Sequence, residues 1–131
     1  YTVEGTSVGN PQFTLDDALN RVSSVAFSPD SKLFVSGSGD KKVRLYDLNR
    51  ARPLQCSLDD ATEGVLSVAF SPDSRLLASA SEDSKVRVYG LMDHSLPSLQ
   101  HTIGDAMDRV VSVGFSADSK HLAIGSSFNE Q

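Results

Sequence analysis

The segment Val25–Asp30 reads Val-Ala-Phe-Ser-Pro-Asp, and its return twice along the chain is the strongest indication of the fold. It is repeated without change at Val68–Asp73 and in the looser form Val-Gly-Phe-Ser-Ala-Asp at Val113–Asp118, at intervals of 43 and 45 residues. When Asp17–Tyr46 is aligned without a gap on Asp60–Tyr89, 19 of 30 positions are identical. A fixed period of this length predicts a repeat architecture with one supersecondary unit per repeat.

Each complete repeat is expected to contain four β-strands. The apolar run Val22–Phe27 suits a strand that is covered on both faces. Ser28–Ser31 has the composition of a turn, because proline, aspartate and serine all favour turn conformations. No segment shows a sustained helical period, so the chain is predicted to be all-β. The strands predicted for the first repeat are Val22–Phe27, Leu33–Ser38, Lys42–Tyr46 and Leu54–Leu58, and the second repeat copies them between Val65 and Ile103.

Units of this length with four antiparallel strands are the blades of a β-propeller. The Val-Ala-Phe-Ser-Pro-Asp segment, the Ser-x-Ser before a turn aspartate and the strand ending Val43–Asp47 together resemble the WD-repeat family. The resemblance covers essentially the whole chain. It implies propeller blades and a role as an interaction scaffold.

The sequence also departs from the family pattern. The Trp-Asp pair of the family appears as Tyr46-Asp47 and Tyr89-Gly90, and the chain has no tryptophan. The Gly-His pair expected before the first strand of a blade reads Asp-Ala at residues 17, 60 and 105, and Phe128 takes the turn position of the third repeat. The family's hydrogen-bond network, which links that histidine to a serine, the turn aspartate and the tryptophan, therefore cannot form in its usual way.

The repeat period also predicts where blades begin and end. Residues 1–15 are expected to end one blade, with strands at Tyr1–Glu4 and Phe13–Leu15, and residues 104–131 are expected to form the first half of another. Residues 16–58 and 59–103 form the two complete blades. This is about three blades' worth, fewer than the four to eight that close a ring. Two interpretations stay open: a segment of a longer propeller, or self-association through incomplete blades.

Composition excludes several classes of partner. The formal net charge of −5 argues against nucleic acid or an anionic membrane surface as the main partner. No apolar run approaches the length that crosses a bilayer, and no signal-peptide pattern opens the chain. Cys56 is the single cysteine, which favours a reducing intracellular compartment, cytoplasmic or nuclear without distinction.

Candidate catalytic and metal-binding motifs are weak. Gly5–Gly9 matches the G-x-S-x-G pattern around Ser7, but that motif requires a strand-to-helix turn, and this segment reads as a loop. His94, His101 and His121 show no metal-ligand spacing. A cation held by the aspartates at 17, 60 and 105 is disfavoured. The sequence therefore predicts no enzyme activity, no cofactor and no metal site.

The turn aspartates Asp40 and Asp83 are interpreted as structural, because an aspartate in a turn accepts backbone N–H bonds from the residues that follow. A modest basic cluster accompanies them on the third strands and their turns. In a chain that is negative overall, this cluster indicates a solvated or salt-bridged strand face rather than a nucleic-acid site. Its members are Lys41, Lys42, Arg44, Lys85 and Arg87.

Acidic residues recur in equivalent loops, and in a propeller of this type these loops share one face. We expect either a solubility device or a docking surface for a basic peptide or protein. The function predicted is a non-enzymatic protein–protein interaction scaffold, and the alternative is a purely structural segment that completes a larger chain or assembly. The candidate partner-binding residues are Asp16, Asp17, Arg21, Asp59, Asp60, Glu63, Glu82, Asp105, Asp108 and Arg109.

Overall fold

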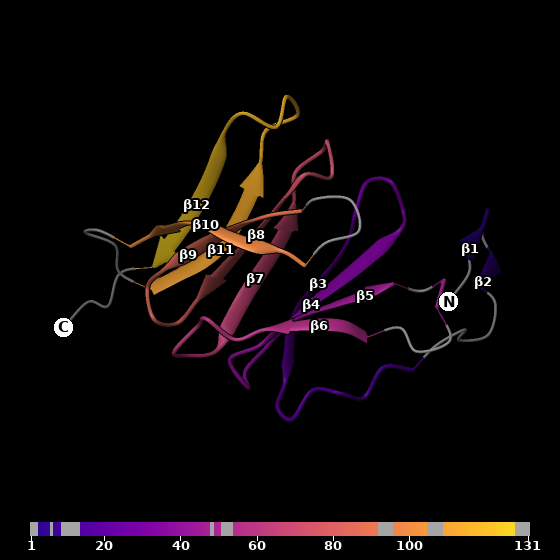
Figure 1. The fold of residues 1–131 in the computed structure, drawn as a ribbon, viewed down its shortest axis with the longest axis horizontal. Helices are drawn as coiled ribbons and strands as arrows, with labels where there is room; N and C mark the ends of the chain where they lie inside the picture. The colour runs from indigo at the N-terminus through magenta and orange to yellow at the C-terminus, as the bar shows by residue number, and fades with distance from the viewer. Residues whose placement is uncertain are drawn as a thin grey trace.

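The structure is a computed structural model that describes residues 3–5, 7–8, 14–47, 49–50, 54–91, 96–104 and 109–127. The described residues form two four-stranded sheets and two two-stranded ladders, all antiparallel, and no helix (Figure 1). The prediction of an all-β chain built from four-stranded antiparallel blades is confirmed. The blade boundaries after residues 15, 58 and 103 stay predictions.

Each four-stranded sheet is a simple meander in which every strand pairs with its neighbour in sequence. The strands begin and end within one residue of the ranges that the repeat predicted. The first sheet contains β3 (Val22–Phe27), β4 (Leu33–Ser38), β5 (Val43–Asp47) and β6 (Leu54–Leu58). The second sheet contains β7 (Val65–Phe70), β8 (Leu76–Ser81), β9 (Val86–Gly90) and β10 (Ser98–Ile103), and β11 (Arg109–Phe115) pairs with β12 (Leu122–Ser127).

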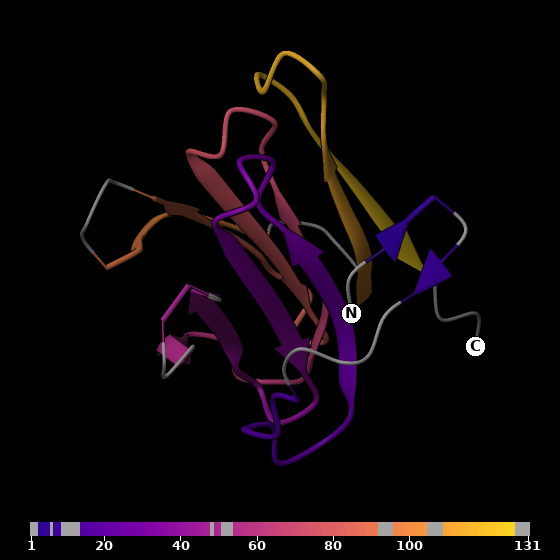
Figure 2. The same ribbon diagram turned by 90° about the vertical axis from the view of Figure 1, so that its right-hand side faces the viewer.

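The repeated Ser-x-Asp sequence closes the first hairpin of each unit in the same way. Ser28 Oγ donates a 2.5 Å hydrogen bond to Asp30 Oδ1, and the Lys32 N–H donates to the same oxygen. Ser71 with Asp73 and Ser116 with Asp118 repeat this pattern. Figures 1 and 2 show the three hairpins projecting from the same end of the molecule.

The sheets are stacked against one another, and apolar residues fill the two spaces between them (Figure 2). Successive side chains of a strand point to opposite faces, so Leu77 faces the first sheet while Ala78 faces β11 and β12. The first core cluster contains Val35, Val43, Leu45, Ala61, Val65, Val68, Phe70, Leu77 and Tyr89. The second contains Ala78, Ala80, Val86, Val88, Val110 and Val113.

The amino-terminal segment differs from the expectation. Strand β1 (Val3–Glu4) pairs with β2 (Ser7–Val8), so the second strand lies before the predicted range Phe13–Leu15. Within that range, residues 14 and 15 are not in a strand, and residue 13 lies outside the described part of the chain. Two residues separate β1 from β2, and this short connection favours local hairpin pairing over the longer-range pairing that the period predicted.

Strand β3 also differs from the expectation that both of its faces are covered. Val25 is 56% exposed and Phe27 is 62% exposed, whereas the equivalent Val68 and Phe70 of β7 are buried. The reason is that β7 packs between two sheets, while among the described residues only the second sheet packs against the first.

Candidate interaction surface

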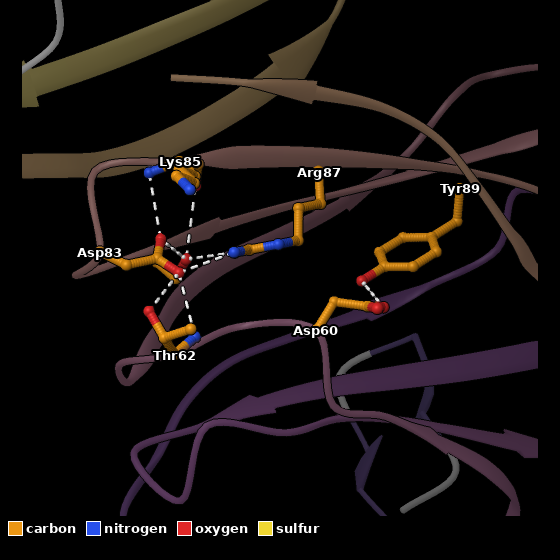
Figure 3. Close-up of polar contacts among 7 residues, drawn as sticks. Asp60, Thr62, Asp83, Lys85, Arg87 and Tyr89 are labelled. Atoms are coloured by element: carbon orange, nitrogen blue, oxygen red, sulfur yellow. Dashed lines mark hydrogen bonds and ion pairs between the residues drawn. The ribbon is translucent and has the colours of Figure 1, made fainter. Parts of the chain in front are cut away.

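The aspartate in the turn between β8 and β9 organises the end of the second sheet (Figure 3). Asp83 accepts hydrogen bonds from the backbone N–H and the hydroxyl of Thr62, which lies in the loop before β7. It also accepts from the Lys85 N–H in its own turn and from the hydroxyl of Ser81. One carboxylate therefore joins the loop before the first strand of the blade to the turn between its second and third strands.

Arg87 completes this cluster from strand β9. Its Nη2 donates a 2.8 Å hydrogen bond to Asp83 Oδ2, and its Nη1 donates a 3.0 Å bond to Ser81 Oγ. Burial acts to raise the pKa of Asp83, but the hydrogen bonds from Arg87, Ser81 and Thr62 outweigh burial and hold the pKa well below its usual range. The carboxylate is therefore charged at neutral pH and pairs with a buried guanidinium.

A second link fastens the same loop to strand β9. The hydroxyl of Tyr89 donates a 2.8 Å hydrogen bond to Asp60 Oδ2 (Figure 3). The Tyr89 side chain is buried, and burial together with the neighbouring Asp60 carboxylate raises the pKa of its phenol. The tyrosine is therefore neutral and donates one hydrogen bond to an aspartate at the surface.

The first sheet contains the same arrangement with fewer bonds. Asp40 accepts from Arg44 at 2.6 Å and from the N–H groups of Leu19 and Lys42, and the Tyr46 hydroxyl donates a 3.2 Å bond to Asp17. Burial opposes ionisation of Asp40, but hydrogen bonds from Arg44, Leu19 and Ser38 lower its pKa to about 2.

Two differences weaken the first cluster relative to the second. Leu19 stands where Thr62 supplies a hydroxyl, and the buried Arg44 Nη1 has no hydrogen-bond partner within the described residues. The equivalent atom of Arg87 is bonded to Ser81. A buried donor without an acceptor costs free energy, so we expect the second cluster to be the more stable of the two.

The sequence did not identify the partners in these clusters. It predicted that a histidine-based network is absent, but it did not predict that arginine and tyrosine replace it. A usable signal was present: both repeats place an arginine four residues after the turn aspartate, and a tyrosine two residues further on. Of the basic cluster, Arg44 and Arg87 are buried in ion pairs, while Lys41 and Lys85 are exposed.

We use the name acidic surface for the carboxylates that the described loops expose near these clusters. Asp17 and Asp60 accept bonds from the two tyrosines, and Glu82 lies 3.4 Å from Arg109 Nη2. The two remaining candidates, Asp105 and Asp108, lie outside the described residues. The members of the acidic surface are Asp16, Asp17, Asp59, Asp60, Glu63 and Glu82, and all six are exposed.

The loops of neighbouring units meet at this end of the molecule. Within each unit, the loop before the first strand is bonded to the turn after the second: the Gly39 N–H donates to the Arg21 carbonyl at 2.8 Å, and the Glu82 N–H donates to the Gly64 carbonyl at 2.8 Å. A Cβ added to Gly64 would lie 3.4 Å from the Cα of Gly39, which shows how closely the two loops approach. Successive units therefore approach each other closely at the loops that contain Gly39 and Gly64.

Two of the candidate residues are arginines. Arg21 directly precedes β3, and Arg109 is the first residue of β11. They line a hollow of about 390 Å³ together with residues of β3, β7 and β11. The surface is thus not uniformly negative, because positive charge borders this hollow. The lining residues are Arg21, Val22, Ser23, Leu66, Arg109 and Val111.

The weak chemical motifs gain no support from their positions. Ser7 lies in the short strand β2, not on a strand-to-helix turn. His101 is on strand β10 and His121 precedes β12, while His94 falls outside the described residues. In the part of the chain that the structure describes, no three His, Cys, Asp or Glu side chains form a potential metal-ligand group. The same residues contain no helix long and apolar enough to cross a membrane.

Comparison with known proteins gives one family match. The family model described as WD domain, G-beta repeat matches residues 9–47 and 52–90, which together make up more than half of the chain. The two matches contain the two complete turn clusters, from Asp17 to Tyr46 and from Asp60 to Tyr89. No curated protein matches the chain.

Proposed function

Because the chain belongs to the WD40 repeat family, whose members generally act as interaction scaffolds rather than enzymes, we propose that it docks a basic peptide or protein segment on the acidic surface. The observation that carries this proposal is the fixed position of the acidic loops. Asp83 with Thr62, and Asp40 with Leu19, attach each loop to a turn that a buried ion pair holds in place. A surface ordered before binding loses little conformational entropy when a partner docks.

The acidic surface divides into carboxylates with internal partners and carboxylates that project into solvent. Asp17 and Asp60 support the fold through the tyrosine hydroxyls, and Glu82 is close to Arg109. Asp16, Asp59 and Glu63 are exposed and are therefore the side chains that we assign to a basic partner. Charges of this kind steer association and select partners more than they fix affinity.

The experiment compares capture by the intact chain with capture by the triple variant Asp16→Asn, Asp59→Asn and Glu63→Gln. Partners are identified by quantitative mass spectrometry at low and at high salt. We expect the triple variant to lose partners whose docking segments are basic, and the intact chain to lose the same partners at high salt, because salt screens exposed charges beyond about 8–10 Å. Leaving Asp17 and Asp60 unchanged preserves their bonds to the tyrosines.

A control variant leaves the acidic surface intact and removes three exposed positive charges from the opposite end of the strands: Lys32→Gln, Arg75→Gln and Lys120→Gln. This control should capture the same partners as the intact chain. If the acidic triple variant binds the same proteins equally well at both salt concentrations, the acidic surface is only a solubility device, and docking of a basic segment is refuted.

The second candidate function is structural, as a set of blades that completes a larger chain or assembly. The exposure of Val25 and Phe27 on β3 favours it, since these side chains present apolar surface that a neighbouring sheet covers in the second unit. Under either function we place the protein in a reducing intracellular compartment, on the basis of its single cysteine, Cys56.

A further inference from the structure

Leu19 lies in the loop before β3 and is the most exposed large apolar side chain among the described residues, at 85%. It follows Asp16 and Asp17 in the same loop, and both of these belong to the acidic surface. A single exposed leucine needs no explanation by itself, because much of any protein surface is apolar. Leu19 differs from such a residue in how firmly its loop is held and in which hydrogen bond it replaces.

The loop is bonded to the first sheet at Leu19 and on both sides of it. The Leu19 N–H donates a 3.0 Å hydrogen bond to Asp40 Oδ2, in the turn that a buried ion pair holds in place. Before Leu19, Asp17 accepts a 3.2 Å bond from a tyrosine hydroxyl, and after it the Arg21 carbonyl accepts the Gly39 N–H at 2.8 Å. The backbone is therefore fixed while the leucine side chain projects into solvent, and a partner that binds this side chain need not order the loop.

The exposure of this position does not depend on whether another sheet packs against the unit. Thr62 occupies the same position in the second unit, and it is exposed although the first sheet packs against the second. Val25 behaves differently, since its equivalent Val68 is buried beneath the first sheet. Leu19 is therefore exposed because of the loop that contains it, as Thr62 is.

Leucine is not the residue that stabilises this position best. Thr62 donates both its N–H and its hydroxyl to Asp83, whereas Leu19 donates only its N–H to Asp40. The first unit thus has an apolar side chain in solvent where a threonine would add a hydrogen bond within the fold. Such departures from the locally favourable residue are typical of functional positions.

We propose that Leu19 is the apolar anchor of the acidic surface and inserts into an apolar pocket of a folded protein partner whose rim carries lysine or arginine. A pocket fits a side chain that projects singly from a fixed loop, and a basic rim complements the carboxylates of Asp16 and Asp17. An apolar side chain that fills a pocket supplies binding energy, whereas the charges around it mainly set the rate of association. This inference rests on the proposed function and identifies the partner as a folded domain and not an extended basic peptide.

The test is Leu19→Thr, which gives the first unit the residue that the second unit has at this position. The variant keeps the N–H bond to Asp40 and supplies a hydroxyl like that of Thr62, so its urea denaturation midpoint should not fall. The probe is the protein most enriched by the intact chain at low salt and released at high salt, purified and measured by surface plasmon resonance. Leu19→Thr should bind this protein about 10-fold more weakly, through faster dissociation and with the salt dependence of association unchanged.

The matched control is Leu96→Thr, the same substitution at a second leucine that is 73% exposed. Leu96 precedes β10, whose first residue Ser98 pairs with Gly90 at the end of β9 that is remote from the Asp83 turn. This control should therefore bind the probe like the intact chain. The acidic triple variant should show the opposite kinetic change to Leu19→Thr, namely slower association with a nearly unchanged dissociation rate.

The outcomes separate failure of this inference from failure of the proposed function. If no captured protein is released by salt, the proposed function is refuted and the anchor with it. If the triple variant associates slowly but Leu19→Thr dissociates as slowly as the intact chain, the acidic surface stands and the anchor alone is overturned. A lower midpoint for Leu19→Thr, or equal weakening by Leu96→Thr, overturns it as well. So does a synthetic peptide of the probe's basic segment that reproduces the difference between Leu19→Thr and the intact chain, because an extended peptide has no pocket.

Discussion

The guanidinium of Arg87 and the carboxylate of Asp83 lie 2.8 Å apart, with side chains that are only 5% and 6% exposed. The pair is therefore a buried ion pair, which agrees with the salt-bridged alternative for the basic cluster and not with the solvated one. Charge placed inside a protein is costly unless it is paired and hydrogen-bonded. Ser81 and Thr62 supply the additional hydrogen bonds that this pair requires.

The first prediction concerns loss of the carboxylate. Asp83→Ala leaves the Arg87 guanidinium buried without its partner, so we expect the free energy of unfolding to fall by about 3–5 kcal/mol. If the substitution removed only the turn's backbone hydrogen bonds, the free energy of unfolding would fall by a smaller amount, on the order of 1 kcal/mol. Urea denaturation followed by circular dichroism measures the difference.

The control for this prediction is the double variant Asp83→Ala with Arg87→Met, which removes both charges and should be more stable than Asp83→Ala alone. Glu63→Gln, at an exposed site, should leave the denaturation midpoint unchanged. A double variant no more stable than Asp83→Ala would mean that the ion pair is not the origin of the loss.

The second prediction concerns acid. The pKa of Asp40 falls from 3.8 to about 2 on folding, and that of Asp83 is also lowered. A lowered pKa contributes stability that is fully present above the unfolded value and is lost as the pH falls through the folded value. We expect the free energy of unfolding to decrease between about pH 4 and pH 2. Asp83→Ala should reduce this decrease, and an equally steep decrease in the variant would assign it to other carboxylates.

The third prediction concerns the tyrosine hydroxyls. Tyr89→Phe removes the 2.8 Å hydrogen bond to Asp60 without changing the buried ring, so unfolding should become easier by about 1 kcal/mol. Tyr46→Phe removes a longer bond of 3.2 Å to Asp17 and should cost less. Thermal and urea unfolding of both variants give the comparison, and a larger loss for Tyr46→Phe would contradict the order that the distances imply.

The fourth prediction concerns the contact between the sheets. A Cβ at Gly37 would lie 2.6 Å from Val65 Cγ1 and 3.2 Å from Val68 Cγ1, so Gly37→Ala should destabilise the fold by about 1–3 kcal/mol. The matched control is Gly114→Ala, where no atom lies within 4 Å of the added Cβ. At the position of Gly114, the other two repeats already have alanine, namely Ala26 and Ala69. Equal unfolding midpoints for the two variants would show that the sheets separate to accept the methyl group.

Much of the fold follows from local sequence. The Ser-Pro-Asp turn at Ser28–Asp30 contains its own hydrogen-bond donor, Ser28, and the acceptor, Asp30, two residues later. In a strand of alternating residues such as Val43–Tyr46, the pattern determines which side chains share a face, so few pairing registers are possible. These features act within a few residues, so their repetition was sufficient to predict the four-stranded sheets. The same reasoning was wrong at the amino terminus, where β2 forms at Ser7–Val8, because a two-residue connection favours local pairing.

The order of residues along the chain specifies the repeating unit: its strands, its turns, its period and the turn aspartates Asp40 and Asp83. The tertiary structure determines which side chains hold a unit together and which of them a neighbouring unit buries. Arg87 and Asp83 are only four residues apart in sequence, yet their ion pair is buried in the folded unit, where the loop that contains Thr62 is hydrogen-bonded to Asp83. The exposure of a side chain also depends on the tertiary structure. Val25 and Val68 occupy the same position in the repeat, and they differ in exposure because another sheet covers only Val68. Local sequence specifies which residues can be buried, and the packing of one unit on the next determines which of them are.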